Sequence, residues 1–117
     1  RRMVRNHMFR HVELFAFEKE EQLAELDSYL EDAPDWPAAM DDYFEEYADL
    51  GVDADARSNS MVLIDENPEA APGQWRVRQI LDDPEKDHGW AFEGMVDLAA
   101  TDEAGEVRLA SLVIHQG

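Results

Sequence analysis

The sequence predicts an α+β domain in which two N-terminal helices pack on a curved antiparallel sheet of about four strands. Apolar residues recur at helical spacing through the first fifty residues and at strand spacing from residue 60 onward. Because the helices precede the strands and do not alternate with them, the order is typical of an α+β fold. A length of 117 residues suits a single domain over residues 1–117.

The first helix is predicted over residues 1–32 and the second over residues 36–50. In both segments the apolar residues recur at steps of three and four, which places them on one helix face. Pro34 ends the first helix, because proline disfavours helical geometry in the residue before it. Pro37 suits the first turn of the second helix, and Gly51 follows as its C-terminal stop.

Residues 60–117 are predicted to form the strands of the sheet. Residues 74–81 alternate in character, with Trp75 on the apolar face and Arg76 on the other. In the next strand Phe92 shares the apolar face, and Asp97 lies on the opposite one. Polar connections at residues 82–89 and 101–105 predict hairpins, so neighbouring strands are expected to be antiparallel.

Two details of the later strands follow from their alternation. Gly94 stands in the middle of a strand, which indicates a bend or a bulge at that point. In the last strand, Leu109 and Ser111 are expected on one face and Leu112 on the other.

The charge of the chain is large and unevenly distributed. The formal net charge is −18, yet the first ten residues hold no acid and four arginines, which are Arg1, Arg2, Arg5 and Arg10. The remaining residues carry six basic side chains against all 28 acidic ones. This acidic body repels phosphate backbones, so nucleic acid is a poor partner for it. The four arginines are the candidate nucleic-acid contact, with an acidic neighbouring domain as their alternative partner.

The composition excludes several classes of protein. The chain has no cysteine, so disulfides, thiolate metal sites and thiol nucleophiles are absent. It has no apolar run of the roughly 20 residues that span a membrane, and no glycine-rich phosphate loop or nucleophile elbow. We therefore expect a cytoplasmic domain without ATPase motifs, membrane contact or cofactor. Because the chain starts at Arg1 and not at Met, we also expect it to be cut from a longer protein.

Two clusters of potential metal ligands stand out in the sequence. His7 and His11 are four residues apart on a predicted helix and so share a face. Asn6 and Met8 flank His7, so the zincin motif is absent, and no third ligand is evident. Residues 82–88 concentrate four carboxylates and a histidine, but their spacing is not that of an EF-hand and suits an ordinary turn. The sequence therefore predicts no metal site.

The strand region also holds candidates for a small-molecule pocket. Its members are Trp75, Trp90, Phe92, Asp97 and His88. Large aromatic side chains at interior positions either line a pocket or fill the core. A buried Asp97 would be a candidate acid or base, whereas an Asp97 on the polar face would be exposed.

Several stretches together resemble one family. They are residues 75–84 (WRVRQILDDP), 87–90 (DHGW), 96–105 (VDLAATDEAG), 4–14 and 43–47. On these residues the chain resembles the C-terminal domain of unknown function that closes certain bacterial DEAD/DEAH-box helicases. The resemblance implies a parent chain that is an ATP-dependent helicase, with its motor domains upstream of this domain and as its partner. No catalytic residue is implied within the domain itself.

The resemblance makes a non-catalytic accessory or interaction domain of a helicase the leading functional expectation. The arrangement of helices and sheet is also similar to the cone-shaped NTF2-like (cystatin-like) and SnoaL-like folds. That similarity implies an alternative, a pocket domain that binds or transforms a small hydrophobic molecule. It also implies a possible homodimer through the open sheet.

Overall fold

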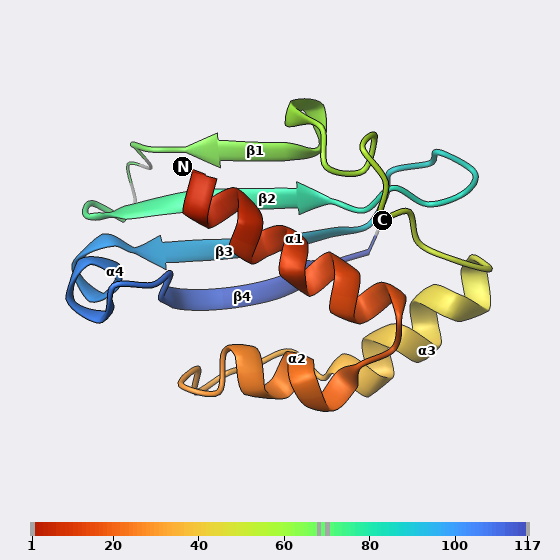
Figure 1. Ribbon diagram of the computed structural model, residues 1–117, viewed down its shortest axis with the longest axis horizontal. Helices are drawn as coiled ribbons and strands as arrows, with labels where there is room; N and C mark the ends of the chain where they lie inside the picture. Colours follow the sequence, from red (N-terminus) through yellow and green to blue (C-terminus); the bar gives the residue numbers. More distant parts are fainter. Residues whose placement is uncertain (1, 68, 70, 117) are drawn as a thin grey trace.

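Helices and strands are segregated along the chain in the computed structural model, which describes residues 2–67, 69 and 71–116 (Figure 1). The α+β class predicted from the sequence is confirmed. In chain order the elements are α1 (Arg2–Ala16), α2 (Glu20–Leu26), α3 (Trp36–Glu46), a short 3₁₀ turn η1 (Asn59–Met61), β1 (Val62–Asp65), β2 (Gln74–Ile80), β3 (Ala91–Asp97), α4 (Leu98–Ala104) and β4 (Leu109–His115). Among the described residues, no helix has both the length and the apolar character needed to cross a bilayer.

The four strands form one antiparallel sheet in the order β1-β2-β3-β4. Helix α1 lies across one face of this sheet, and α2 and α3 lie beside the edge formed by β4 (Figure 1). Val77, Gly94 and Leu112 stand in register on the face toward the helices, and all three are buried. The alternation of β2 and β3 predicted from the sequence is therefore confirmed, with Arg76 and Asp97 on the opposite, uncovered face.

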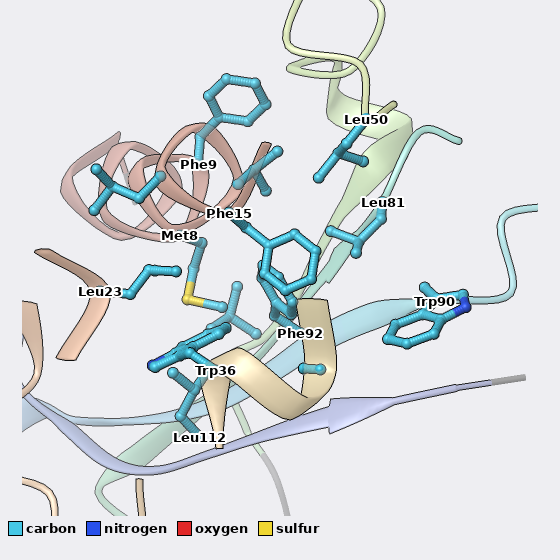
Figure 2. Close-up of a cluster of buried hydrophobic side chains, with 14 of the residues drawn as sticks. Met8, Phe9, Phe15, Leu23, Trp36, Leu50, Leu81, Trp90, Phe92 and Leu112 are labelled. Atoms are coloured by element: carbon cyan, nitrogen blue, oxygen red, sulfur yellow. The ribbon is translucent and has the colours of Figure 1, made fainter. Parts of the chain in front are cut away.

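Aromatic rings fill the space between the sheet and the helices (Figure 2). Phe15 of α1 packs edge-on against Phe92 of β3, with ring centroids 5.4 Å apart. Phe15 also contacts Trp36 and Tyr43 of α3, and Tyr43 contacts Trp90. Burial of each such side chain stabilises the fold by about 1.5–3 kcal/mol, so this cluster fixes α1 and α3 on the sheet.

The single helix predicted over residues 1–32 is wrong, because α1 ends at Ala16 and α2 begins at Glu20. The break is a Schellman motif: the Lys19 N–H donates to the Leu14 carbonyl, and the Glu18 N–H donates to the Phe15 carbonyl. Glu18 adopts the left-handed conformation with a φ of 55°. Glycine is the usual residue at this position, so a glutamate there gave no sequence signal for the break.

The second helix ends earlier than the predicted range of 36–50. Asp35 caps its start, as its carboxylate accepts the Ala38 N–H, but Tyr47 is already extended. The chain leaves the helix so that Leu50 is buried and the Gly51 N–H donates to the Asp82 carbonyl. Gly51 therefore contacts the connection between β2 and β3 and does not end the helix.

The region predicted as strand alone, residues 60–117, contains the additional helix α4. Asp97 is the N-cap of this helix, and its carboxylate accepts the Ala100 N–H at 3.0 Å. Gly105 ends it in the left-handed conformation, with a φ of 73°. Seven residues are too few for a periodic pattern, so the segment resembled a turn in sequence.

The alternation predicted for the last strand is wrong in part. Met95 pairs with Ser111, but Val96 pairs with Leu109, so the register between β3 and β4 shifts by one residue. This irregularity puts Leu109 and Leu112 on the same buried side. It lies next to Gly94, where the sequence predicted a bend or bulge.

Candidate functional site

A polar cluster is buried between α1 and the turn after α2. His7 and His11 lie one helical turn apart, and both present Nε2 to the carboxylate of Asp27, which directly follows α2. His7 Nε2 lies 2.9 Å from Asp27 Oδ1, and His11 Nε2 contacts Oδ2. The Tyr29 hydroxyl donates to Asp27 Oδ1 at 3.1 Å and accepts the Leu109 N–H at 2.8 Å.

These contacts and the burial of the cluster shift the ionisation of Asp27 and Tyr29. The side chains of His11 and Asp27 are 0% and 4% exposed, and that of His7 is 13% exposed. Burial alone would raise the pKa of the Asp27 carboxyl, but the hydrogen bonds from His11 and His7 outweigh burial and hold its pKa well below its usual range. Burial raises the pKa of the Tyr29 hydroxyl to about 12, so Tyr29 remains a donor to Asp27 at neutral pH.

The sequence indicated His7 and His11 as a pair but missed Asp27. Asp27 is 16 residues from His11, beyond a helix break that the sequence did not reveal. The one sequence signal for Asp27 is its position four residues after Leu23, an apolar residue of the helix. That spacing alone does not identify a partner for the carboxylate. Two imidazoles and a carboxylate can hold a proton, a metal ion or simply one another.

A second candidate site is a cationic pocket of about 400 Å³ at the start of α1. Its lining comes from α1, from the loop before the sheet and from the sheet itself. The residues are Arg2, Arg5, Asn6, Phe9, Arg57, Asn59, Val62 and Gln79. This lining contains three guanidinium groups and no carboxylate, in a chain whose formal net charge is −18.

Two of the three guanidinium groups of this pocket are held in place by neighbours. Arg5 donates to the side-chain oxygen of Asn59, and the guanidinium of Arg57 lies 4.6 Å above the ring of Phe9. Gln79 is 2% exposed and donates to the Met61 carbonyl at 3.2 Å, which fixes the floor of the pocket. Such pre-ordered donors suit an anion with several oxygens.

Of the four N-terminal arginines predicted to contact nucleic acid, Arg2 and Arg5 line this pocket. Arg2 and Arg5 share a helix face with Phe9, at steps of three and four residues. Arg10 is exposed but is five residues beyond Arg5, so it lies on another face. Arg1 lies outside the described residues. The sequence did not associate Arg57 with them, because it comes from a loop 52 residues after Arg5.

The acidic turn at residues 82–88 is held by its own hydrogen bonds. The Asp83 carboxylate accepts backbone N–H groups from Glu85, Asp87 and His88 at 2.8–3.0 Å. Asp82 contacts the Lys86 ammonium at 2.9 Å and His88 Nε2 at 2.9 Å. Burial opposes ionisation of Asp83, yet these backbone donors hold its pKa below the usual value. The turn thus matches the ordinary-turn interpretation.

The structure does not bring the five predicted pocket residues together. Trp90 and Phe92 are 3% and 0% exposed and pack in the core, and Trp75 packs at the edge of that core. Asp97 lies on the other face of the sheet, where it caps α4. His88 lies in the acidic turn with Asp82. Asp97 cannot join the aromatic side chains, because Phe92 and Asp97 are five residues apart in β3 and so point to opposite faces of the sheet.

These features define an acidic α+β domain with a buried histidine–aspartate cluster and one cationic pocket. Residues 1–114 match a protein family described as "Domain of unknown function (DUF3516)", and the chain belongs to that family. No curated protein and no solved structure matches the chain.

Proposed function

We propose that this chain is a non-catalytic accessory domain at the C-terminus of a DEAD/DEAH-box helicase. One observation supports the non-catalytic role most directly: three carboxylates that could have acted as acids or bases are all engaged in hydrogen bonds within the domain. Asp83 accepts backbone N–H groups of its own turn, and Asp97 caps the N-terminus of α4. Asp27 is hydrogen-bonded to His7 and His11. The resemblance of residues 75–84 and 96–105 to the helicase C-terminal domain supports the context.

The uncovered face of the sheet is the surface that we propose for contact with the motor domains. One row across this face consists of Leu63, Arg78, Glu93 and Val113, which stand in register. Leu63 and Val113 are 53% and 47% exposed, and Arg78 pairs with Glu93 at 3.7 Å. A face with apolar ends and a charged centre suits a docking surface between domains. Helices before a four-stranded sheet also support a relation to the NTF2-like cone.

The test is to compare the parent helicase with and without this domain. The isolated domain should release no phosphate from ATP. The parent lacking the domain should still hydrolyse ATP but unwind fewer duplexes per ATP hydrolysed. The proposal is wrong if the gene encodes no motor domains upstream of this domain, or if the isolated domain hydrolyses ATP.

A second candidate function is contact with the phosphate groups of nucleic acid through the cationic pocket. It is favoured by the grouping of Arg2, Arg5 and Arg57 around one hollow without a lining carboxylate. In a parent helicase, such a pocket would place one or two phosphates against the domain while the acidic body repels the rest of the strand.

The test is the salt dependence of binding to a fluorescent duplex oligonucleotide. The slope of log K against log salt should lose roughly 0.9 for each phosphate contact removed, so the double variant Arg5→Ala and Arg57→Ala should lose about 1.8. The matched control is Arg76→Ala with Arg78→Ala, because these two arginines already pair with Asp65 and Glu93 on the sheet. Equal slopes in both double variants would exclude the pocket as the contact.

A further inference from the structure

Three potential metal ligands converge where α1 meets the turn after α2. His7 Nε2, His11 Nε2 and a carboxylate oxygen of Asp27 all lie within 4.8 Å of one another. A tetrahedral zinc ion with bonds of ~2.0–2.1 Å holds its ligand atoms roughly 3.3 Å apart. His7 Nε2 and Asp27 Oδ1 are 2.9 Å apart, so a small rotation of these side chains would admit an ion between them.

The hydrogen bonds of His11 fix the orientation of its ring and aim Nε2 at Asp27. His11 Nδ1 lies 2.8 Å from the backbone carbonyl of His7, which can only accept, so Nδ1 carries a proton. In a neutral imidazole the other nitrogen, Nε2, then has a lone pair, and that lone pair faces the acceptor oxygen of Asp27. A proton on Nε2 makes this contact a hydrogen bond to Asp27, and a metal ion that replaces the proton would bind the same two atoms.

The surroundings of the cluster are those of a metal site. A metal-bound histidine usually donates its other ring N–H to a carbonyl or carboxylate, as His11 does to the His7 carbonyl. Metal-bound carboxylates are in turn hydrogen-bonded, as Asp27 is by the Tyr29 hydroxyl. His11 is fully buried beside Trp36, whereas His7 is 13% exposed and leaves a route of entry from solvent.

We propose that His7, His11 and Asp27 bind one divalent transition-metal ion that fastens α1 to the chain after α2. Zinc fits this donor set best, because two imidazoles and one carboxylate are ligands of zinc sites, while magnesium and calcium prefer oxygen alone. The ion stabilises the folded state, since the unfolded chain does not hold the three ligands together. This role is independent of the helicase context.

The first experiment measures zinc binding directly. Protein freed of its purification tag and dialysed against a chelator is titrated with zinc chloride in a calorimeter, and its melting temperature is recorded with and without zinc. We expect one equivalent per chain and a higher melting temperature with zinc. Cobalt(II) in place of zinc should give the visible absorption of a four-coordinate ion. Absence of uptake of either metal would overturn the proposal.

The variants His7→Ala and His115→Ala locate the site. His7 is partly exposed, so its loss should leave the fold intact by circular dichroism, yet weaken zinc binding by at least the ~10- to 100-fold seen for outer-shell partners. His115 pairs with Glu93 on the sheet, and its variant should bind zinc as the wild type does. Equal affinity in both variants would show adventitious binding only and overturn the site.

A third measurement needs no substitution at His11, whose complete burial makes a variant prone to misfold. A long-range ¹H–¹⁵N NMR spectrum reports which ring nitrogens of a histidine carry protons. With one equivalent of zinc, His11 Nε2 should lose its proton and shift to the metal-bound range while Nδ1 stays protonated. A proton on both nitrogens in the presence of zinc would show a charged histidine paired with Asp27, and no metal site.

Discussion

At the scale of single residues, the buried carboxylates carry the strongest constraints on this domain. Asp83 is 1% exposed and would be costly to bury without partners. Three backbone N–H donors satisfy it, and they organise the connection from β2 to β3 around one side chain. The Asp82 carboxylate in turn holds the side chains of Lys86 and His88 against this connection. The acidic composition of the turn therefore has a structural cause.

The lowered pKa of Asp83 predicts a loss of stability in acid. A carboxylate with a depressed folded-state pKa stabilises the fold fully above its unfolded value, about 3.9, and loses that contribution as the pH falls toward the folded value. Asp83→Asn should therefore be less stable than wild type at pH 7, and the difference should shrink below about pH 4. Urea unfolding from pH 7 to pH 3 measures this, with the exposed Asp102→Asn as the control. A difference that does not change with pH would contradict it.

Periodicity explains which residues could be placed from sequence. The alternation of β2 and β3 repeats over several residues, so Phe92 was correctly placed on the buried face and Asp97 on the opposite one. Asp27 could not be placed, because its contact with His11 joins two segments through the folding of a turn. Arg57 was missed for the same reason. Tertiary contacts between loops and helices leave no period in the sequence.

At the scale of elements, the break between α1 and α2 depends on one unusual conformation. Glu18 has a φ of 55°, which is costly for a residue with a side chain and free for glycine. The same conformation turns the chain so that α2 can return along α1 and place Asp27 against His11. The sequence contained helix-favouring residues throughout this stretch, and tertiary packing overrode their propensity.

Glu18→Gly should stabilise the domain by up to about 1 kcal/mol, because relief of about 1–2 kcal/mol of left-handed strain exceeds the roughly 0.4–1 kcal/mol of extra unfolded-state entropy that glycine brings. The matched control is Glu21→Gly in the first turn of α2, which should destabilise by up to about 1 kcal/mol. The free energy of unfolding from urea titration distinguishes the two. If Glu18→Gly is the less stable of the pair, the Schellman motif does not form as described.

At the scale of the whole molecule, the charge of −18 opposes compaction. The acids are spread over helices and turns, and few ion pairs among the described residues are buried. At low ionic strength their mutual repulsion is poorly screened, since the Debye length is about 30 Å at 0.01 M salt and about 10 Å at 0.1 M. The four strands and the aromatic core must hold the fold against this repulsion.

Added sodium chloride should therefore raise the melting temperature by a few degrees between 0.01 M and 0.5 M, because screening weakens the repulsion among acidic groups. Differential scanning calorimetry in this range measures the effect, and a neutral osmolyte at equal osmolality is the control for excluded-solvent effects. A melting temperature that falls with salt would mean that ion pairs contribute more than repulsion.

The hydrogen bond from the Leu109 N–H to Tyr29 has a consequence for the order in which the domain is made. Synthesis on the ribosome proceeds from the N-terminus, so α1, α2 and Asp27 emerge long before Leu109. Until β4 leaves the exit tunnel, Tyr29 lacks its backbone donor and the core lacks Leu109 and Leu112. The nascent domain therefore cannot complete its core until the last strand has been synthesised, although the first helices emerge much earlier.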